Sequence, residues 1–478
     1  MRKKFFLIPL IIIISYLLIN QILGNYKFKR ILNSYINTDT RQIIKKYLFP
    51  YMIIRQQEEK INNQKEKINN QIMFLSKINL YMHDIQIKKG LKEISFKKNE
   101  IIKLKNNNLK LEKFLSEKNF FINGNGNAYP GSAYIDVYKD KIYLLTSIGI
   151  IGVSSLNDNG DEIIFKQIKN NIEDFLGIDQ FEKSAEEGGG FTVKDVKIFN
   201  NKFYISYTNE VETNCWNTSI IVADLNNSDL KFNKFFSPDE CIHPLKNEDK
   251  EFNAHQSGGR IIFLDDETLV FSIGDYKNRM LAQKKDSVFG KIIKININSK
   301  EFEIISLGHR NPQGLYYDKN NNFLLSTEHG PKMGDEINLI KLDQSIIYNY
   351  GWPIASYGEH YGSTNLEEIY KKYPLHKSHK KYGFIEPLHY FIPNSQVSSA
   401  SIGMSEIIGL NKEKSYVASS LNGKSLFFFN LSEENKILNF ENVNIGERIR
   451  DLFLYDNKIF LFLETTTSLG IINIKEIN

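Results

Sequence analysis

The sequence predicts an all-β propeller domain that follows a membrane-spanning helix and a helical stalk. Three observations support this: an uncharged apolar segment near the N-terminus, a polar segment nearly free of glycine, and a strand-and-turn pattern that recurs six times. The predicted boundaries are 1–25, 26–121 and 122–478. A hydrophobic fraction of 41% is enough for a sizeable core, and 13% aromatic residues suit a strand-rich domain.

The first segment, Phe5–Gly24, contains no charged residue and is rich in Ile and Leu. Its length is sufficient to cross a bilayer as a helix. A cleaved signal peptide is the alternative, but it would have a shorter apolar core and a small-residue cleavage site, which we do not find before Asn25. We therefore favour an uncleaved signal-anchor that holds the protein at a membrane. Basic residues on both flanks leave its orientation open.

The second segment is predicted to be a helical stalk. Apolar residues recur every seven positions at Ile54, Ile61, Ile68 and Leu75. This spacing indicates a helix, for which a coiled coil that mediates self-association is one interpretation. A solvated spacer helix is the other, because only one apolar position of the repeat is well kept.

The basic residues are concentrated in the N-terminal part of the chain. Residues 1–120 contain 24 Lys and Arg against 9 Asp and Glu, whereas the remainder contains 37 against 47. An acidic C-terminal domain argues against binding to nucleic acid. A basic segment beside a membrane helix suits contact with anionic lipid headgroups.

The two cysteines, Cys215 and Cys241, show no metal-binding spacing. They are compatible with two buried free thiols. They are equally compatible with one disulfide, if the domain lies in an oxidising compartment.

The third segment contains a polar turn followed by a mostly apolar strand, repeated six times. Intervals of this size fit four-stranded blades arranged radially, which predicts a six-bladed β-propeller. A β-sandwich with similar hairpins is the alternative. The six copies are Asp140–Ser147, Asn201–Thr208, Glu267–Gly274, Asn321–Glu328, Glu413–Ser420 and Asn457–Glu464.

Clusters of Gly, Pro and polar residues lie at the ends of these predicted strands. Loops of this composition present carbonyls and side chains to a ligand. Each cluster alone also fits an ordinary turn or a solvated face, so their combination is what indicates a site. The clusters are His255–Arg260 with Gly274–Asp275, Gly308–Leu315, Glu328–Pro331 with Gly334–Asn338 and Asn349–Pro353, and Arg448–Asp451.

The strings GHRNPQGL, DEINLI and NYGWP follow one another within residues 308–353. In this order they resemble the soluble glucose dehydrogenases and aldose sugar dehydrogenases that depend on pyrroloquinoline quinone (PQQ). The resemblance runs from about His255 to Asp451. It implies a periplasmic propeller that oxidises an aldose or a related alcohol by hydride transfer to PQQ and passes the electrons to an acceptor.

The resemblance also implies roles for individual residues. His255 would be the general base, and Asp275 would orient it, since a carboxylate partner fixes the tautomer of an imidazole. The carbonyls of Gly330 and Pro331 would bind Ca²⁺, which prefers oxygen ligands and would polarise the reacting carbonyl. The cofactor-binding residues would be Arg310, Asn311, Gln313, His329, Asn422, Lys424, Arg448 and Arg450.

Two of these positions depart from the family pattern. His329 stands where the compared family member has Gln, and Asn422 stands where the family has a cofactor-binding lysine. Lys424 is the replacement that the sequence offers, two residues further along. Because PQQ carries three carboxylates, the loss of one cation would weaken its binding.

The sequence thus favours a membrane-anchored, PQQ-dependent sugar dehydrogenase with Ca²⁺. One alternative is a tethered propeller that has lost the cofactor and acts as a binding or scaffold module, which the absence of a cation near Asn422 would favour. Another is a calcium-dependent lactonase, for which we find no set of channel-facing carboxylates in the sequence.

Overall fold

The computed structural model describes six residues between 57 and 65, and then residues 93–104, 109–116, 132–156, 160–176, 190–342, 346–361, 366–391 and 401–474. It divides into two compact units, Met1–Lys77 and Ile78–Asn478. In the first unit the six described residues are helical and exposed. The predicted membrane helix lies outside the described residues. Among those described, no helix combines the length and apolar character that crossing a membrane requires.

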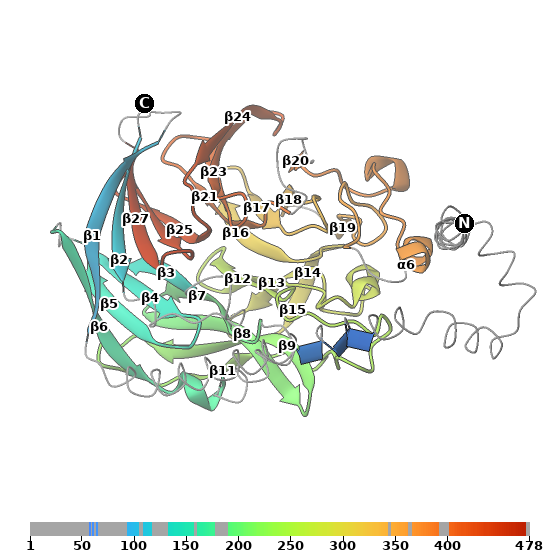
Figure 1. Ribbon diagram of the computed structural model, residues 1–478, viewed down its shortest axis with the longest axis horizontal. Helices are drawn as coiled ribbons and strands as arrows, with labels where there is room; N and C mark the ends of the chain where they lie inside the picture. Colours follow the sequence, from blue (N-terminus) through green and yellow to red (C-terminus); the bar gives the residue numbers. More distant parts are fainter. Residues whose placement is uncertain are drawn as a thin grey trace, which may run out of the picture. The chain divides into compact units, whose positions relative to one another are not determined.

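Five sheets form the second unit, and nearly all of their strands are antiparallel (Figure 1). The largest sheet contains strands from both the N-terminal and the C-terminal part of this unit. Its strands, in spatial order, are β25 (Ile449–Tyr455), β26 (Lys458–Leu463), β27 (Ser468–Asn473), β2 (Lys110–Ser116), β1 (Glu93–Lys103), β6 (Glu162–Asn170), β5 (Ile151–Ser155), β4 (Lys141–Thr146) and β3 (Ala133–Tyr138), with β10 (Asp229–Leu230) beside β6.

The other four sheets follow one another along the chain. The first contains β11 (Asn233–Phe236), β9 (Cys215–Asp224), β8 (Lys202–Glu212) and β7 (Val193–Phe199). The second contains β12 (Gly258–Phe263), β13 (Thr268–Ile273), β14 (Lys291–Asn296), β15 (Phe302–Leu307) and β19 (Tyr348–Asn349). The third contains β16 (Pro312–Asp318), β17 (Phe323–Glu328), β18 (Glu336–Lys341) and β20 (His389–Tyr390). The fourth contains β21 (Met404–Gly409), β22 (Ser415–Ser420), β23 (Ser425–Leu431) and β24 (Ile437–Asn444).

The described helices are short and lie in connections between strands. They are η2 (Ile172–Asp174), η3 (Arg279–Gln283), α6 (Leu366–Lys372) and η4 (Lys380–Tyr382).

The inner strands of these sheets form a closed ring. Contacts run from β3 to β7, β12, β16, β21 and β25 and then return to β3. Buried aspartates connect neighbours in this ring, because each accepts a hydrogen bond from the backbone of the next inner strand. The amide of Ile198 donates to Asp136 at 2.7 Å, and the amide of Ile261 donates to Asp195 at 2.7 Å. The amide of Ile135 donates to Asp451 at 2.8 Å. The all-β, propeller-like fold predicted from the sequence is therefore confirmed.

The six repeated segments are all strands, as predicted. They correspond to β4, β8, β13, β17, β22 and β26, and each pairs directly with one of the strands of the inner ring. The repeat therefore marks the strand next to the ring in each case. The apolar side chains of these strands are buried on both faces of the sheet.

The helical assignment of residues 93–103 and 110–116 is wrong, because both segments are strands. β1 and β2 form a hairpin that pairs with β6 on one side and with β27 on the other. Figure 1 shows these blue strands beside the red C-terminal strands. Ile94 and Phe96 are buried, whereas Glu93 and Lys97 are exposed and Ser95 is half-buried, so this part of β1 has the period of two that a strand requires. The Lys-rich composition concealed this alternation.

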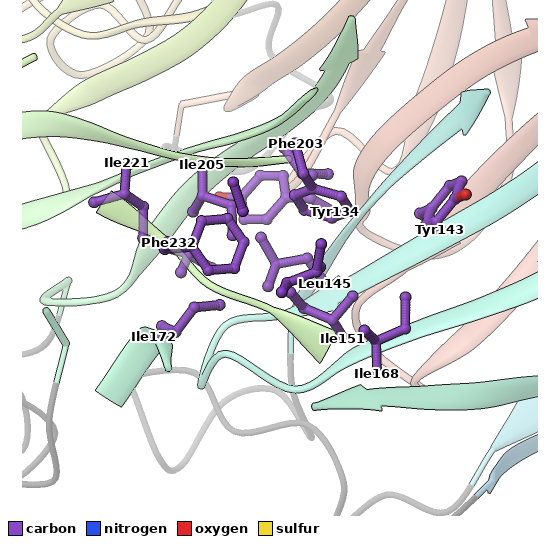
Figure 2. Close-up of a cluster of buried hydrophobic side chains, with 14 of the residues drawn as sticks. Tyr134, Tyr143, Leu145, Ile151, Ile168, Ile172, Phe203, Ile205, Ile221 and Phe232 are labelled. Carbon is purple, nitrogen blue, oxygen red and sulfur yellow. The ribbon is translucent and has the colours of Figure 1, made fainter. Parts of the chain in front are cut away.

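A large apolar core lies between the largest sheet and the sheet that contains β7, β8 and β9 (Figure 2). Tyr143 and Leu145 of β4 face Phe203 of β8, and the rings of Tyr143 and Phe203 meet edge to face with centroids 5.9 Å apart. Aromatic pairs in this geometry add to the stabilisation from buried area. Such cores hold neighbouring sheets together and so fix the ring of inner strands.

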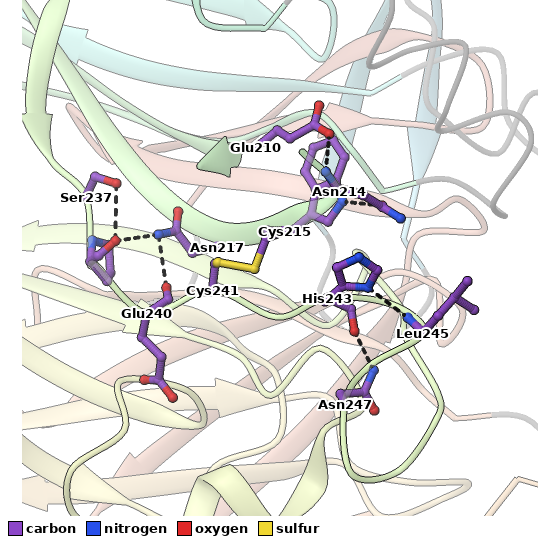
Figure 3. Close-up of a disulfide and its surroundings, with 12 residues drawn as sticks. Glu210, Asn214, Cys215, Asn217, Ser237, Glu240, Cys241, His243, Leu245 and Asn247 are labelled. Atoms are coloured by element: carbon purple, nitrogen blue, oxygen red, sulfur yellow. Dashed lines mark hydrogen bonds between the residues drawn. A yellow bond between two sulfur atoms is a disulfide. The ribbon is translucent and has the colours of Figure 1, made fainter. Parts of the chain in front are cut away.

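The two cysteines form a disulfide (Figure 3). It joins Cys215, at the start of β9, to Cys241, in the loop that follows β11, across 26 positions of sequence. Nearby, the side chain of Asn217 donates hydrogen bonds to the carbonyls of Pro238 (2.7 Å) and Glu240 (3.2 Å). The loop is thus held to the sheet by both covalent and polar links.

Candidate active site

A cavity of about 400 Å³ opens where the inner strands begin. We call it the basic cavity. Inner strands β3, β7, β16 and β25 contribute side chains, and the loops that precede or join the strands contribute the others. Its lining includes Tyr134, Lys194, His255, Gln256, Lys277, Arg310, Asn311, Gln313, His329, Gly330, Tyr361, Leu421, Arg448, Arg450 and Glu464.

Irregular register at the start of the inner strands shapes this cavity. The pairing of β7, β16 and β25 with their neighbours shifts within 193–195, 312–314 and 449–451. The residues skipped by these shifts are Lys194, Gln313 and Arg450, and all three line the basic cavity. A β-bulge leaves one residue unpaired and redirects its side chain, which explains why the three side chains point to a common space.

The charge of the cavity lining is predominantly positive. Among the described residues of the lining, two lysines and three arginines face a single carboxylate, that of Glu464. This carboxylate accepts from Arg450 Nη2 at 3.0 and 3.2 Å and lies 3.6 Å from Arg448 Nε. The Nε atom of Arg450 is buried and has no hydrogen-bond partner among the described residues. The described lining therefore has more basic side chains than carboxylates, which suits an anionic ligand.

Arg310 is fixed by several contacts at the mouth of the cavity. Its Nη1 donates to the carbonyl of His329 at 2.9 Å. Its guanidinium lies over the rings of Trp352 and Tyr361, 5.5 and 5.9 Å from their centroids. Stacking on aromatic faces preorganises a guanidinium and leaves its edge available to a carboxylate.

Asn311 and Gln313 join this arginine in the same loop and strand. The side-chain oxygen of Asn311 accepts from the amide of Gly258 at 3.0 Å and from Gln313 Nε2 at 3.3 Å. The Gln313 oxygen lies 3.4 Å from Arg450 Nη1, which donates to it. The structure thus brings these three predicted residues together with Arg450.

His255 lies on a tight turn that reaches the cavity wall. Its backbone amide donates to Asn253 Oδ1 at 2.8 Å, and the amide of Gln256 donates to the carbonyl of Asn253 at 3.0 Å. The His255 side chain is half-buried and lines the cavity. It is therefore placed where it could exchange a proton with a ligand held by the arginines.

Asp275 lies behind the cavity wall and contacts it through Gln256. Its carboxylate accepts from Trp352 Nε1 at 2.8 Å and from the amide of Lys277 at 2.9 Å. With its side-chain amide oriented to satisfy both neighbours, Gln256 donates to Asp275 at 3.0 Å and accepts from Arg310 at 2.8 Å. Burial raises the pKa of Asp275 to about 6, and Arg310 opposes that shift. Asp275 thus holds the residue adjacent to His255.

His329 is held neutral in the cavity wall. Burial, and then the charges of Arg310, Arg450 and Arg448, lower its pKa to about 3. Its Nε2 atom is buried and has no hydrogen-bond partner among the described residues. A neutral imidazole here could bind a polar group of a ligand, as the glutamine of the compared family member could.

Gly330 borders the cavity, and its amide donates to Asp335 Oδ1 at 2.9 Å. The Pro331 carbonyl accepts from the amide of Gly334 at 3.0 Å and from the hydroxyl of Ser401 at 3.2 Å. In the described part of the chain no group of three His, Cys, Asp or Glu side chains is arranged to bind a metal. A calcium ion here would therefore rely on backbone carbonyls, together with oxygens from its ligand.

Asn422 and Lys424 are exposed and are not among the residues that line the cavity. The Asn422 side chain donates to the carbonyl of Ser401 at 2.9 Å, and its neighbour Leu421 borders the cavity instead. Lys424, the replacement cation that the sequence offered, is therefore not among the lining residues. Lys194 is among them, although no motif of the sequence marks it, because its position depends on how β7 lies beside the other inner strands.

The profile of the Glucose / Sorbosone dehydrogenase family matches residues 177–471. The chain belongs to this family, as the resemblance implied. It is 30% identical to the aldose sugar dehydrogenase of Escherichia coli over 217 residues, which cover 41% of this chain and 53% of that protein. It is 34% identical to quinoprotein glucose dehydrogenase B of Acinetobacter calcoaceticus over 139 residues, which cover 23% and 28%. A protein of Synechocystis with no assigned function is 31% identical over 41% of this chain and 50% of its own length. The chain therefore spans about half the length, or less, of these curated relatives.

Solved structures support the same fold. A crystal structure of glucose dehydrogenase has a TM-score of 0.55 and 21% identity, covering 74% of this chain and 97% of that chain. The apo-form of the soluble aldose sugar dehydrogenase from Escherichia coli has a TM-score of 0.55 and 18% identity, covering 76% and 100%. The PQQ-bound aldose sugar dehydrogenase from Streptomyces coelicolor has a TM-score of 0.51 and 16% identity, covering 72% and 93%.

Proposed function

We propose that this protein is a PQQ-dependent dehydrogenase that oxidises an aldose sugar or a related alcohol. The observation that supports this most strongly is the convergence of His255 with Arg310, Arg448 and Arg450 on one cavity. Family relatives named as an aldose sugar dehydrogenase and as a quinoprotein glucose dehydrogenase support the same chemistry. The described residues of the lining fit a polycarboxylate cofactor, because basic side chains outnumber carboxylates among them.

In the proposed mechanism the arginines bind and orient the cofactor. When bound, PQQ would supply the two-electron acceptor for a hydride from the substrate. His255 would take the proton from the substrate hydroxyl at one ring nitrogen, and the Asp275–Gln256 link would hold its loop in place. Gly330 and Pro331 remain the proposed calcium ligands, of which the Pro331 carbonyl would have to exchange its present hydrogen bonds.

We also propose two structural features that the sequence predicts, namely six blades and an N-terminal membrane anchor. We infer that the ring of inner strands corresponds to six blades, because each inner strand begins its own antiparallel run of strands. In this interpretation β2 completes the last blade and β1 extends the first.

The N-terminal helix would anchor the protein, with the propeller in an oxidising compartment such as the periplasm. The disulfide supports that location.

The test is PQQ binding to the purified full-length protein, with and without Ca²⁺, followed by dye reduction with a panel of aldoses. Calcium-dependent binding with dye reduction is the expected result. If PQQ does not bind at concentrations that saturate family enzymes, the dehydrogenase proposal fails. The cofactor-free binding module then becomes the better interpretation.

A further inference from the structure

Lys194 is a buried lysine of the basic cavity that belongs to none of the sequence motifs of the proposed site. It lies on β7, is only 8% exposed, and lines the cavity. Its Nζ donates to the carbonyl of Ala254 at 3.1 Å and to the carbonyl of Gly190. Protonation gives this nitrogen a third N–H donor, which is then available for a further acceptor. Ala254 precedes His255, so this lysine also holds the turn that carries the proposed base.

The position of Lys194 is equivalent to that of two proposed cofactor-binding residues. It is skipped by the register shift of β7, just as Gln313 is skipped on β16 and Arg450 on β25. All three residues stand at the start of an inner strand and line the same cavity. The geometry that directs Gln313 and Arg450 inward therefore directs Lys194 inward as well.

The neighbouring backbone is built around the Lys194 side chain. Gly259 has a φ of +114°, and a Cβ placed on it would lie 2.3 Å from the Lys194 Cβ and 3.1 Å from its Cγ. A residue with a side chain would therefore displace the lysine stem. Gly259 lies on β12, four residues after His255, so the lysine stem packs against the strand that follows the turn of the proposed base.

The charges around Lys194 favour an anion in the cavity. The inner strands present Tyr134 and Arg450 to this space, and the end of β26 presents Glu464. The loops present His255, Lys277, Arg310, His329 and Arg448. Burial, and then the charge of Arg450, lower the pKa of Lys194 to about 7. Since Glu464 is already paired with Arg450, it does not compensate the lysine. A carboxylate placed beside the lysine would favour its charged form.

We propose that Lys194 is a further cofactor-binding residue, which supplies from β7 the cation that Asn422 does not supply and takes up a proton when the carboxylates of PQQ enter the cavity. This inference rests on the proposed function. The proton goes from solvent to the Lys194 amine, and the resulting ammonium pairs with a cofactor carboxylate. The family's lysine site and this one would thus be alternative ways to neutralise the same ligand.

The experiment is titration calorimetry of the full-length protein with PQQ at pH 8, in two buffers of different ionisation enthalpy. The wild-type protein is expected to take up about one proton per bound PQQ, because most of the Lys194 amine is neutral before binding. Lys194→Met is expected to lose this uptake and to bind PQQ at least about tenfold more weakly. Lys277→Met is the matched control, because Lys277 lines the same cavity but lies 3.6 Å from Glu251. It should retain the proton uptake.

A second variant separates the cation from its titration. Lys194→Arg carries a permanent charge and should bind PQQ without proton uptake. The inference is overturned if wild-type protein binds PQQ with no proton uptake at pH 8, or if Lys194→Met takes up as many protons as wild type. These results would leave the proposed function intact. Failure of the wild-type protein to bind PQQ would instead overturn the proposed function, and this inference with it.

Discussion

The basic cavity and the buried Arg260 cluster lie at neighbouring levels of the same inner strands but have opposite charge balances. We define the Arg260 cluster as Arg260, Asp195, Glu406 and Asp451. In this cluster one guanidinium nitrogen contacts three carboxylates, with Asp195 at 2.8 Å, Asp451 at 3.0 Å and Glu406 closer still. In the part of the basic cavity that the described residues form, one carboxylate faces five basic side chains.

Consecutive residues supply the two regions. On β7, Lys194 lines the cavity while Asp195 joins the cluster, and on β25 the same holds for Arg450 and Asp451. The cluster is satisfied internally, because its aspartates also accept hydrogen bonds from backbone amides of neighbouring inner strands. In the basic cavity, by contrast, the buried Nε atom of Arg450 has no hydrogen-bond partner among the described residues. The comparison therefore indicates that the cluster stabilises the ring, whereas the basic side chains of the cavity suit an anionic ligand.

The largest expected effect comes from the cavity side. Replacing His255 by Ala should reduce turnover about 10²–10⁴-fold, since a general base contributes that range. The melting temperature and PQQ affinity should remain close to those of the wild type, as measured by calorimetry. His243→Ala is a control, because this histidine lies in the loop beside the disulfide (Figure 3). Full activity in His255→Ala would refute its assignment as the base.

The next effect comes from the Arg260 cluster. Arg260→Met would leave three buried carboxylates without their cation, and we expect the free energy of unfolding to fall by about 3–5 kcal/mol in urea denaturation. Arg450→Met is the matched variant on the cavity side. It should destabilise less, because Glu464 keeps Arg448 as a neighbour, but it should weaken PQQ binding. Equal losses of stability in both variants would contradict the comparison.

A smaller effect is expected where the two regions meet. Gly259→Ala would place a methyl group against Lys194 at a φ of +114°. Overpacking together with backbone strain should cost about 1–3 kcal/mol in thermal or urea unfolding. The substitution should also weaken PQQ binding through the displaced lysine. Unchanged stability would show that the lysine stem can move aside.

The last effect depends on pH. Since burial raises the pKa of Asp275 from 3.8 to about 6, the folded state binds this proton more tightly than the unfolded state does. The contribution of Asp275 to stability therefore falls as the pH rises from about 4 to 6, by at most about 1.4 kcal/mol per pH unit. Asp275→Asn should remove that component from the urea-unfolding profile. Parallel profiles for the two proteins would show that Asp275 does not titrate in this range.

Much of the architecture was predictable because it depends on local pattern. The six repeated segments are strands next to the inner ring, and the Gly- and Pro-rich clusters mark the loops that border the cavity. The β1–β2 hairpin was misassigned, because a Lys-rich composition outweighed an alternation that becomes decisive only when β6 and β27 cover the apolar face. The pairing of Cys215 with Cys241 likewise depended on bringing two loops together.

The sequence by itself determined the all-β class, the family, and most side chains of the site, because His255 and the arginines belong to motifs that are contiguous in the chain. Only the tertiary structure decided which cations share the cavity. It excluded Lys424 from the lining and included Lys194, which comes from a different strand. The physical reason is that a register shift of one residue redirects a side chain, and such shifts depend on pairing between strands and are not visible in the sequence.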